Sequence, residues 1–191
     1  MAKLYFRYGA MGSSKTANAL MVRFNYMERG KKVLMLKPAC ENRDGDNVIR
    51  SRIGLYAQCK PAEEVLQKGI LAVDAVIVDE VQFLKPEYID KLALYVDEGN
   101  IPVICYGLRT DFQGHLFPGS RRLMEIADVI EEIPTICWCG RKAHFNARVQ
   151  DGKIIRQGEV FEQGGNEKYI SLCRKHYRWG IIMESKKEED L

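Results

Sequence analysis

Eight consecutive residues near the start of the chain have the composition of a phosphate-binding loop. They follow a short apolar stretch and lead into a helix-like pattern: they are Gly9, Ala10, Met11, Gly12, Ser13, Ser14, Lys15 and Thr16. Backbone N–H groups in such a loop can surround phosphates, and the positive end of the following helix adds attraction. Lys15 is then placed to reach the β- and γ-phosphates of a nucleoside triphosphate, and Thr16 to offer its hydroxyl to Mg²⁺.

Ser14 stands where such loops usually have the glycine that precedes the lysine. Glycine adopts backbone angles that serine resists. Either the loop accepts right-handed helical angles at this position, or its affinity for the nucleotide is altered. The alternative interpretation of the whole segment is a Gly- and Ser-rich turn ahead of a helix.

Two carboxylates, Asp79 and Glu80, follow a buried strand pattern over residues 75–78. Ligands bind at the carboxyl ends of strands in open α/β sheets. Adjacent residues on a strand point in opposite directions, so one carboxylate could face Mg²⁺ and the other the acceptor. We predict that Asp79 serves Mg²⁺ and that Glu80 takes a hydroxyl proton during phosphoryl transfer. A helix-capping role for one of the two is the alternative.

Four residues toward the end of the chain have the types and spacing of a metal site. Cys137 and Cys139 form Cys-x-Cys, and Cys173 and His176 form Cys-x-x-His. Three thiols and one imidazole match a closed, structural Zn²⁺ site, in which no position is left open for chemistry. Unliganded cysteines are the alternative. The scattered cysteines are predicted to be small buried hydrophobic residues: they are Cys40, Cys59 and Cys105.

Composition and charge narrow the class of protein. Of 191 residues, 46% are hydrophobic and 29% charged, as in ordinary globular proteins. The net charge of +3 is too small to indicate a nucleic-acid or membrane partner. No apolar run approaches the length of a membrane span, and the start of the chain lacks a signal-peptide pattern. We therefore expect a cytoplasmic protein that binds neither nucleic acid nor membrane.

Strand and helix patterns alternate along the first two thirds of the chain. Strands are expected over residues 3–8, 32–36, 73–78, 101–106 and 129–133. Helices are expected over 15–28, 61–68, 86–98 and 121–127, the last capped by Ser120, with loops over 38–58 and 108–119. This order predicts an α/β fold of the P-loop NTPase type, a parallel sheet flanked by helices.

The pattern changes after Pro134. A hairpin is expected around Asp151-Gly152 and a helix from about residue 167 to 178. We predict a nucleotide-binding domain over residues 1–134 and a small zinc-binding domain over 135–183. The charged segment 184–191 is expected to be a disordered tail.

Together, motifs spread over residues 3–178 resemble the zinc-containing, type II family of thymidine kinases. Beside the phosphate loop, the resemblance rests on Asp79 to Phe83, Tyr106 to Phe112, Cys137-x-Cys139, Gly164-Gly165, and Tyr169 before Cys173 to His176. The Cys-x-Cys spacing is similar to that of the bacterial branch.

The resemblance implies transfer of the γ-phosphate of ATP to the 5′-hydroxyl of thymidine, which gives dTMP for DNA synthesis. Glu80 matches the family's general base. The implied ATP and Mg²⁺ site comprises residues 9–16, Asp79 and Gln82. The implied nucleoside site, which includes a loop that closes over thymidine, comprises Met11, Glu41, Phe83, Leu108, Phe112, Phe117, Val160, Gln163, Gly164 and Tyr169.

Two further properties follow from the resemblance alone: a homotetramer, and feedback inhibition by thymidine triphosphate (dTTP). Ser14 departs from the family pattern, and so does Glu41, where relatives often carry aspartate. Independently of the family, Phe112 and Phe117 lie in a Gly-containing loop after a buried strand, where flat rings can stack on a base. Ordinary core aromatics are the alternative for both.

Two other functions stay open at this point. The first is a P-loop ATPase whose zinc module binds nucleic acid or a protein, for which basic residues after Cys139 give some support. The second is a kinase for another deoxynucleoside. ATP turnover in the presence of single-stranded DNA, compared with each nucleoside, separates the three functions.

Overall fold

The computed structural model describes residues 1–42, 45–160 and 169–183, which form two compact units. The first unit contains Met1–Gly9, Ser14–Arg109 and Leu116–Ile133. The second contains the described residues from Pro134 onward together with two excursions of the earlier chain, Ala10–Ser13 and Thr110–His115. The middle of the phosphate loop therefore belongs to the same unit as the cysteine–histidine residues. A division of the sequence into continuous segments does not show this.

The first unit is built on a parallel six-stranded sheet in the order β5-β2-β6-β7-β1-β8. In chain order the strands are β1 (Leu4–Tyr8), β2 (Val33–Lys37), β5 (Lys60–Pro61), β6 (Ala75–Val78), β7 (Val103–Gly107) and β8 (Val129–Glu132). The predicted α/β fold with a parallel sheet is confirmed. β6 lies between β2 and β7, so the residues that follow it emerge in the middle of the carboxyl edge.

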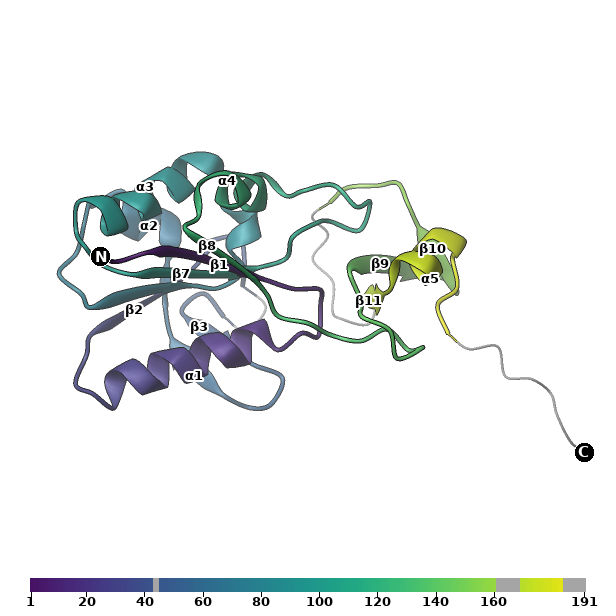
Figure 1. The fold of residues 1–191 in the computed structure, drawn as a ribbon, viewed down its shortest axis with the longest axis horizontal. Helices are drawn as coiled ribbons and strands as arrows, with labels where there is room; N and C mark the ends of the chain where they lie inside the picture. Colours follow the sequence, from purple (N-terminus) through teal and green to yellow (C-terminus); the bar gives the residue numbers. More distant parts are fainter. Residues whose placement is uncertain (43–44, 161–168, 184–191) are drawn as a thin grey trace, which may run out of the picture. The chain divides into compact units, whose positions relative to one another are not determined.

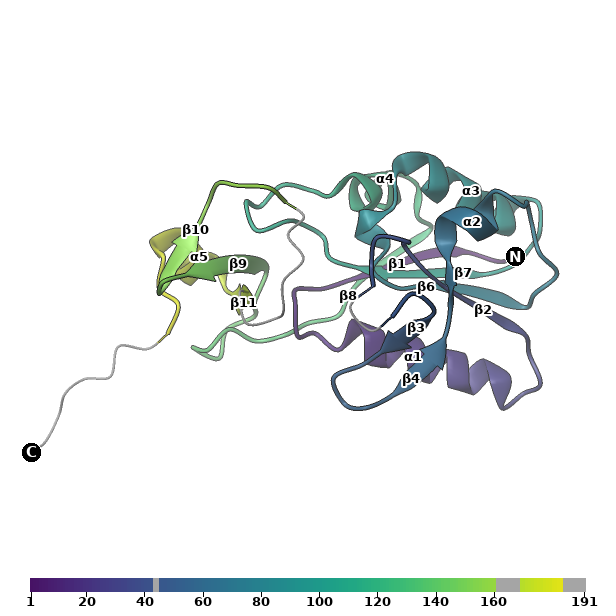
Figure 2. The same cartoon turned by 180° about the vertical axis from the view of Figure 1, so that it is seen from behind.

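Helices cover both faces of this sheet (Figures 1 and 2). One face carries α1 (Lys15–Met27); the other carries α2 (Ala62–Leu66), α3 (Pro86–Asp97) and α4 (Pro118–Ile126). Because side chains alternate along a strand, β6 contributes residues to two apolar clusters. Val76 and Val78 pack into one apolar cluster, whereas Ile77 packs into the other.

Three local features differ from the sequence prediction. The expected loop 38–58 contains an antiparallel hairpin of β3 (Val48–Arg50) and β4 (Tyr56–Gln58). These strands have three residues each, too few for a period-2 pattern to show. Helix α4 begins at Pro118, whose missing N–H suits a first helical turn, so Ser120 is not its cap. A short 3₁₀ turn, η1 (Val81–Phe83), follows the carboxylates.

The second unit is built on an antiparallel sheet in the order β10-β9-β11, which is followed by α5 (Arg174–Trp179). The strands are β9 (Phe145–Gln150), β10 (Lys153–Ile155) and β11 (Tyr169–Leu172). The predicted hairpin is confirmed: Asp151 and Gly152 both have positive φ, as its two-residue turn requires.

The expected helix from about residue 167 is wrong over its first part, because Tyr169–Leu172 pairs with β9 as a strand. Among the described residues, no helix has both the length and the apolar character needed to cross a membrane. The predicted tail, 184–191, lies outside the described residues.

Candidate active site

In the first unit, the end of the phosphate loop lies against the carboxylate that follows β6. Lys15, the first residue of α1, is buried, and its Nζ donates to the backbone oxygen of Gly9 at 3.2 Å. Thr16 hydrogen-bonds through its side chain to Asp79. The predicted Lys15, Thr16 and Asp79 thus form one cluster, with an ammonium, a hydroxyl and a carboxylate within reach of the same ligand.

Ser14 has left-handed backbone angles, φ 60° and ψ 27°, immediately before α1. The possibility that this residue adopts right-handed angles is therefore wrong. The side chain of Ser14 makes no capping hydrogen bond to the helix that could offset the conformational cost. For a residue with a Cβ atom that cost is about 1–2 kcal/mol.

The middle of the loop, Ala10–Ser13, is held within the second unit. It turns tightly: the N–H of Ser13 donates to the backbone oxygen of Ala10 at 3.3 Å, and Gly12 has a φ of 74°. The N–H of Met11 donates to Oδ1 of Asn146 at 2.7 Å. A residue far along the chain therefore contacts the loop.

Asp79 is a buried acid whose charged form is disfavoured. Burial is the main cause, and repulsion from Glu80 adds to it, so that the pKa of Asp79 rises to about 7. The hydrogen bond from Thr16 and the charge of Lys15 act in the opposite direction. A cation at this carboxylate would favour the charged form, which fits the predicted Mg²⁺ role.

Glu80 lies beyond the end of β6, with left-handed angles of φ 52° and ψ 33°. The direction of its carboxylate is therefore set by the left-handed backbone at the start of η1, and not by the alternation of side chains along a strand. Its Oε2 accepts a hydrogen bond of 2.6 Å from Nε2 of Gln82. Glu80 is only half-buried, whereas Asp79 is buried, so the two acids have different environments.

Gln82 links this acid to the strand beside it. Its side chain is buried, and its Oε1 accepts from the N–H of Leu108 at 2.9 Å. Oγ of Ser120 donates to the backbone oxygen of Leu108 at 2.6 Å, so that side chains bind both backbone polar groups of this residue. A Cβ atom at Gly107 would lie 2.6 Å from Oε1 of Gln82, so glycine is required there. Both ends of the Gln82 amide thus bind protein groups, and its role toward ATP or Mg²⁺ stays a prediction.

The predicted nucleoside-site residues are distributed over the two units. In the first, the rings of Phe83 and Phe117 meet edge to face with centroids 5.6 Å apart. Leu108 is joined to η1 through Gln82, and Glu41, buried, follows β2. The structure thus brings Phe83 and Phe117 together on elements that follow β6 and β7.

In the second unit, Phe112 is buried, and its backbone oxygen accepts a hydrogen bond of 2.6 Å from the hydroxyl of Tyr177. The guanidinium of Arg148 lies 5.4 Å from the centre of the Phe112 ring. Tyr169 begins β11, and Val160 is partly exposed. The remaining predicted residues, Gln163 and Gly164, lie outside the described part of the chain.

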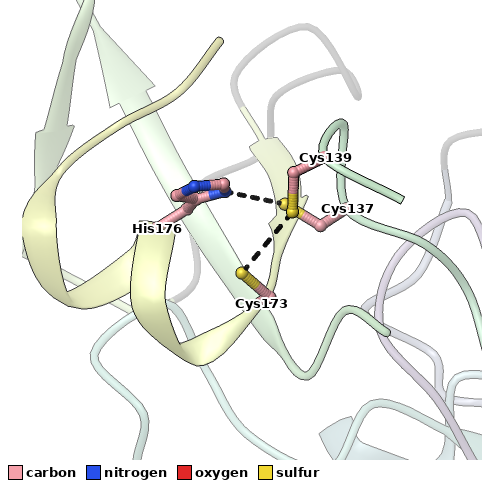
Figure 3. A group of neighbouring side chains, drawn as sticks. All are labelled: Cys137, Cys139, Cys173 and His176. Carbon is pink, nitrogen blue, oxygen red and sulfur yellow. Dashed lines mark hydrogen bonds between the residues drawn. The ribbon is translucent and has the colours of Figure 1, made fainter. Parts of the chain in front are cut away.

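The four predicted metal ligands converge in the second unit (Figure 3). Cys137 and Cys139 come from a tight turn closed by the Gly140 N–H on the Cys137 oxygen, and Gly140 has a φ of 79°. Cys173 precedes α5 and His176 lies within it. All four ligand atoms lie within 4.8 Å of one another.

The spacing of these atoms fits a tetrahedral zinc ion. With Zn–S bonds of about 2.3 Å, two sulfur ligands should lie about 3.8 Å apart. Sγ of Cys139 and Sγ of Cys173 are 3.9 Å apart, and Sγ of Cys137 lies 3.3 Å from Nδ1 of His176. The N–H of Arg141 lowers the pKa of the Cys139 thiol and so favours the thiolate that a metal binds.

Comparison with known proteins identifies the family. A profile described as thymidine kinase matches residues 2–177, almost the whole chain. The chain belongs to the thymidine kinase family. This confirms the resemblance drawn from the motifs.

Bacterial thymidine kinases are similar to this chain along nearly their entire length. The chain is 46% identical to that of Novosphingobium aromaticivorans, over 93% of this chain and 97% of the relative. It is 44% identical to that of Francisella tularensis, over 95% of this chain and 99% of the relative. Among solved structures, it is similar to a DNA replication initiation factor with a TM-score of 0.40 and 18% identity, over 69% of this chain and 40% of that one.

Sequence reasoning included Gln82 in the candidate site but missed the backbone contacts that Gln82, Ser120 and Asn146 make. Gln82 and Ser120 fix Leu108, and Asn146 contacts Met11. Their partners are backbone groups far away in the sequence, so no local spacing reveals them. Buried amides on otherwise apolar elements are the one available signal, because such groups need hydrogen-bond partners.

Proposed function

We propose that this member of the thymidine kinase family transfers the γ-phosphoryl group of ATP to the 5′-hydroxyl of thymidine. The observation that supports it best is the cluster after β6, where Glu80 stands beside the Lys15–Thr16–Asp79 group. The product, dTMP, is a precursor for DNA synthesis, so the reaction salvages a nucleoside.

Each residue of the cluster has a distinct role in this proposal. Glu80 accepts the 5′-hydroxyl proton as the bond from O5′ to the γ-phosphorus forms and the bond from that phosphorus to ADP breaks. Lys15 and the N–H groups of Gly12 and residues 14–16 stabilise negative charge on the phosphates, whereas the N–H of Met11 is bound by Asn146. Thr16 and Asp79 hold Mg²⁺, which neutralises phosphate charge when it is bound. Gln82 orients the general base, Glu80, through its hydrogen bond to Oε2 of that residue.

The nucleoside is recognised, in the same proposal, by the predicted aromatic and apolar residues. Phe83, Leu108 and Phe117 contribute from the first unit. The family resemblance gives Met11, Phe112 and Tyr169 the same role, which stays a prediction. Flat rings suit a pyrimidine base, and exclusion of water around the γ-phosphate limits wasteful hydrolysis of ATP.

The cysteine–histidine cluster is proposed to hold a structural Zn²⁺ ion. Four protein ligands complete a tetrahedral shell, so the metal has no vacant position for substrate. Two properties rest on the family resemblance: a homotetrameric assembly and inhibition by dTTP. A cytoplasmic location stays an expectation from the sequence patterns. The mild net charge supports the expectation that the enzyme uses neither nucleic acid nor a membrane as partner.

ADP formation tests this function. ATP and Mg²⁺ are supplied alone and then with each deoxynucleoside, to the wild type, to Glu80→Gln and to a control, Glu64→Gln, on the exposed side of α2. We expect turnover with thymidine and close analogues that falls by at least about 10²-fold in Glu80→Gln, since a general base contributes about that much. The Glu64→Gln control and the binding of ATP should be unchanged.

Two outcomes lead elsewhere. ADP formation that ignores every nucleoside and rises with single-stranded DNA returns the chain to the class of ATPases with a zinc module. A response to another deoxynucleoside and none to thymidine keeps the mechanism but changes the substrate.

A further inference from the structure

Two polar side chains of the second unit hold the two backbone polar groups of one residue in the phosphate loop. The N–H of Met11 donates to Oδ1 of Asn146 at 2.7 Å, and its backbone oxygen accepts from Oγ of Ser171 at 2.5 Å. Both polar groups of a single loop residue are therefore satisfied by side chains more than a hundred positions later in the sequence.

The two side chains form a pair because of strand register. Asn146 in β9 and Ser171 in β11 are direct partners in the antiparallel ladder. Residues opposite each other in such a ladder project from the same face of the sheet. This face of the sheet therefore presents a side-chain carbonyl and a hydroxyl side by side. The carbonyl can accept from a backbone N–H, and the hydroxyl can donate to a backbone C=O.

The amide of Asn146 has only one orientation that satisfies its neighbours. Its Nδ2 donates to the backbone oxygen of Thr110 at 3.3 Å. Because the Met11 N–H can only donate and the Thr110 carbonyl can only accept, a flipped amide would lose both bonds. The residue is 4% exposed, so water does not compensate for a lost partner.

Other contacts of the same unit reinforce the arrangement. The hydroxyl of Tyr177, in α5, donates to the backbone oxygen of Phe112 at 2.6 Å. The hydroxyl of Thr135 lies 3.4 Å from the backbone oxygen of Gly12. Both excursions of the earlier chain into this unit, Ala10–Ser13 and Thr110–His115, are thus tied to elements that surround the metal ligands.

We propose that Asn146 and Ser171 are positioning residues for ATP, which keep the backbone at Met11 of the phosphate loop in its binding geometry before the nucleotide arrives. A loop fixed in advance loses less conformational freedom on binding, and this preserves affinity. The proposal rests on the loop's proposed role in binding ATP, but it does not depend on which nucleoside accepts the phosphate.

Direct measurement of ATP affinity by calorimetry, with no nucleoside present, tests the proposal. Ser171→Ala removes the bond to the Met11 oxygen and should weaken ATP binding about three- to tenfold, the effect of one hydrogen bond of about 1 kcal/mol. Ser171→Thr keeps a hydroxyl at the same atom and should restore most of the affinity.

The two ends of Asn146 can be separated in the same assay. Asn146→Asp keeps an oxygen that accepts from Met11 and loses the donor to Thr110. Asn146→Leu, of similar size, loses both. We expect Asn146→Leu to bind ATP at least about threefold more weakly than Asn146→Asp.

A matched control excludes a simple loss of stability. Ile170→Ala alters the neighbouring position of β11, where the side chain packs into the apolar cluster of the second unit. This variant should lower the melting temperature at least as much as Ser171→Ala while ATP affinity stays at the wild-type value. If ATP affinity instead follows melting temperature across all the variants, or if Ser171→Ala binds ATP like the wild type, the proposal is overturned.

The outcome also separates this inference from the proposed function. A wild type that binds ATP but phosphorylates no thymidine refutes the kinase function and leaves the positioning role to be judged by the affinities. If thymidine is phosphorylated normally while Ser171→Ala and Asn146→Leu bind ATP like the wild type, the kinase function stands and the positioning role is refuted. If Ser171→Ala does not fold, the comparison of the two Asn146 variants decides.

Discussion

Ser14 shows how one residue can be strained in a loop that otherwise follows its motif. Left-handed angles are free of steric cost only for glycine, and the hydroxyl of Ser14 gains no capping bond in return. We predict that Ser14→Gly raises the free energy of unfolding by about 0.5–1 kcal/mol, since strain relief exceeds the entropy that glycine adds to the unfolded chain. Urea unfolding without nucleotide measures this.

Ser14→Ala is the matched control for that prediction. It removes the hydroxyl but keeps the Cβ atom that causes the strain, so its stability should stay close to that of the wild type. A stabilised Ser14→Ala, or a destabilised Ser14→Gly, would show that the conformational argument fails at this position.

The raised pKa of Asp79 predicts that the stability of the protein depends on pH when neither Mg²⁺ nor nucleotide is bound. This pKa is about 7 in the folded protein and about 4 in the unfolded chain, so between these values the folded state binds the extra proton. Stability should therefore decrease as the pH rises from about 4 to 7, by an amount on the order of a few kcal/mol. Asp79→Asn, which cannot ionise, should lose this decrease and be more stable than the wild type at pH 8.

Thr16→Val provides a second check on the same carboxyl group. The Thr16 hydrogen bond lowers the pKa of Asp79, so its removal should move the decrease in stability to higher pH. Unfolding curves at several pH values, recorded in a chelator, measure both variants. A decrease that is equally large in Asp79→Asn would assign it to other groups.

At the scale of the element, periodic sequence patterns predicted those parts that bury one continuous face. Helix α1 was expected over residues 15–28 and is found at Lys15–Met27, and the helix expected over 86–98 is α3, Pro86–Asp97. β6 was recognisable because it is apolar on both faces, as a central parallel strand must be. Helix α1 and strand β6 position Lys15 and Asp79. This part of the candidate site could therefore be predicted from the sequence.

The elements that could not be predicted are short and depend on distant partners. Tyr169–Leu172 is a strand because β9 lies beside it, although its residues fit the start of a helix equally well. The same pairing places Ser171 opposite Asn146, so the contact with Met11 was out of reach of any local pattern. Glu80 was identified as the base by its type, but its orientation arises from a left-handed turn that no spacing encodes.

At the scale of the whole molecule, the second unit has a small apolar core and a candidate metal site. Its core includes the ligands Cys137 and Cys173 themselves, beside Ala143, Ala147, Leu172 and Tyr177. Such a unit buries little apolar surface, and a zinc ion bound at the candidate site would supply folding free energy that the core does not. Removal of the metal should therefore affect this unit more than the six-stranded sheet.

Trp138 offers a reporter for that prediction, because its ring stacks on the ligand His176 with centroids 4.2 Å apart. The chain has two tryptophans, so Trp179→Phe leaves Trp138 as the single tryptophan, whose emission can be excited selectively. We predict that a strong chelator changes its emission and abolishes amide-exchange protection in β9 and β11, while β6 and β7 stay protected. Fluorescence and hydrogen exchange, recorded on the same samples, measure the two effects.

Cysteine variants complete the test of the metal. Cys173→Ser should lower the metal content from about one zinc per chain to near zero and reproduce the effects of the chelator. Cys40→Ser, outside the cluster, should change neither; this cysteine is exposed, so its predicted burial is wrong. Since Met11 is hydrogen-bonded to strands β9 and β11 of this unit, loss of the metal should also weaken ATP binding. Metal-free protein that keeps full protection in β9 and β11 would instead mean that the apolar core alone maintains the sheet that contacts the phosphate loop.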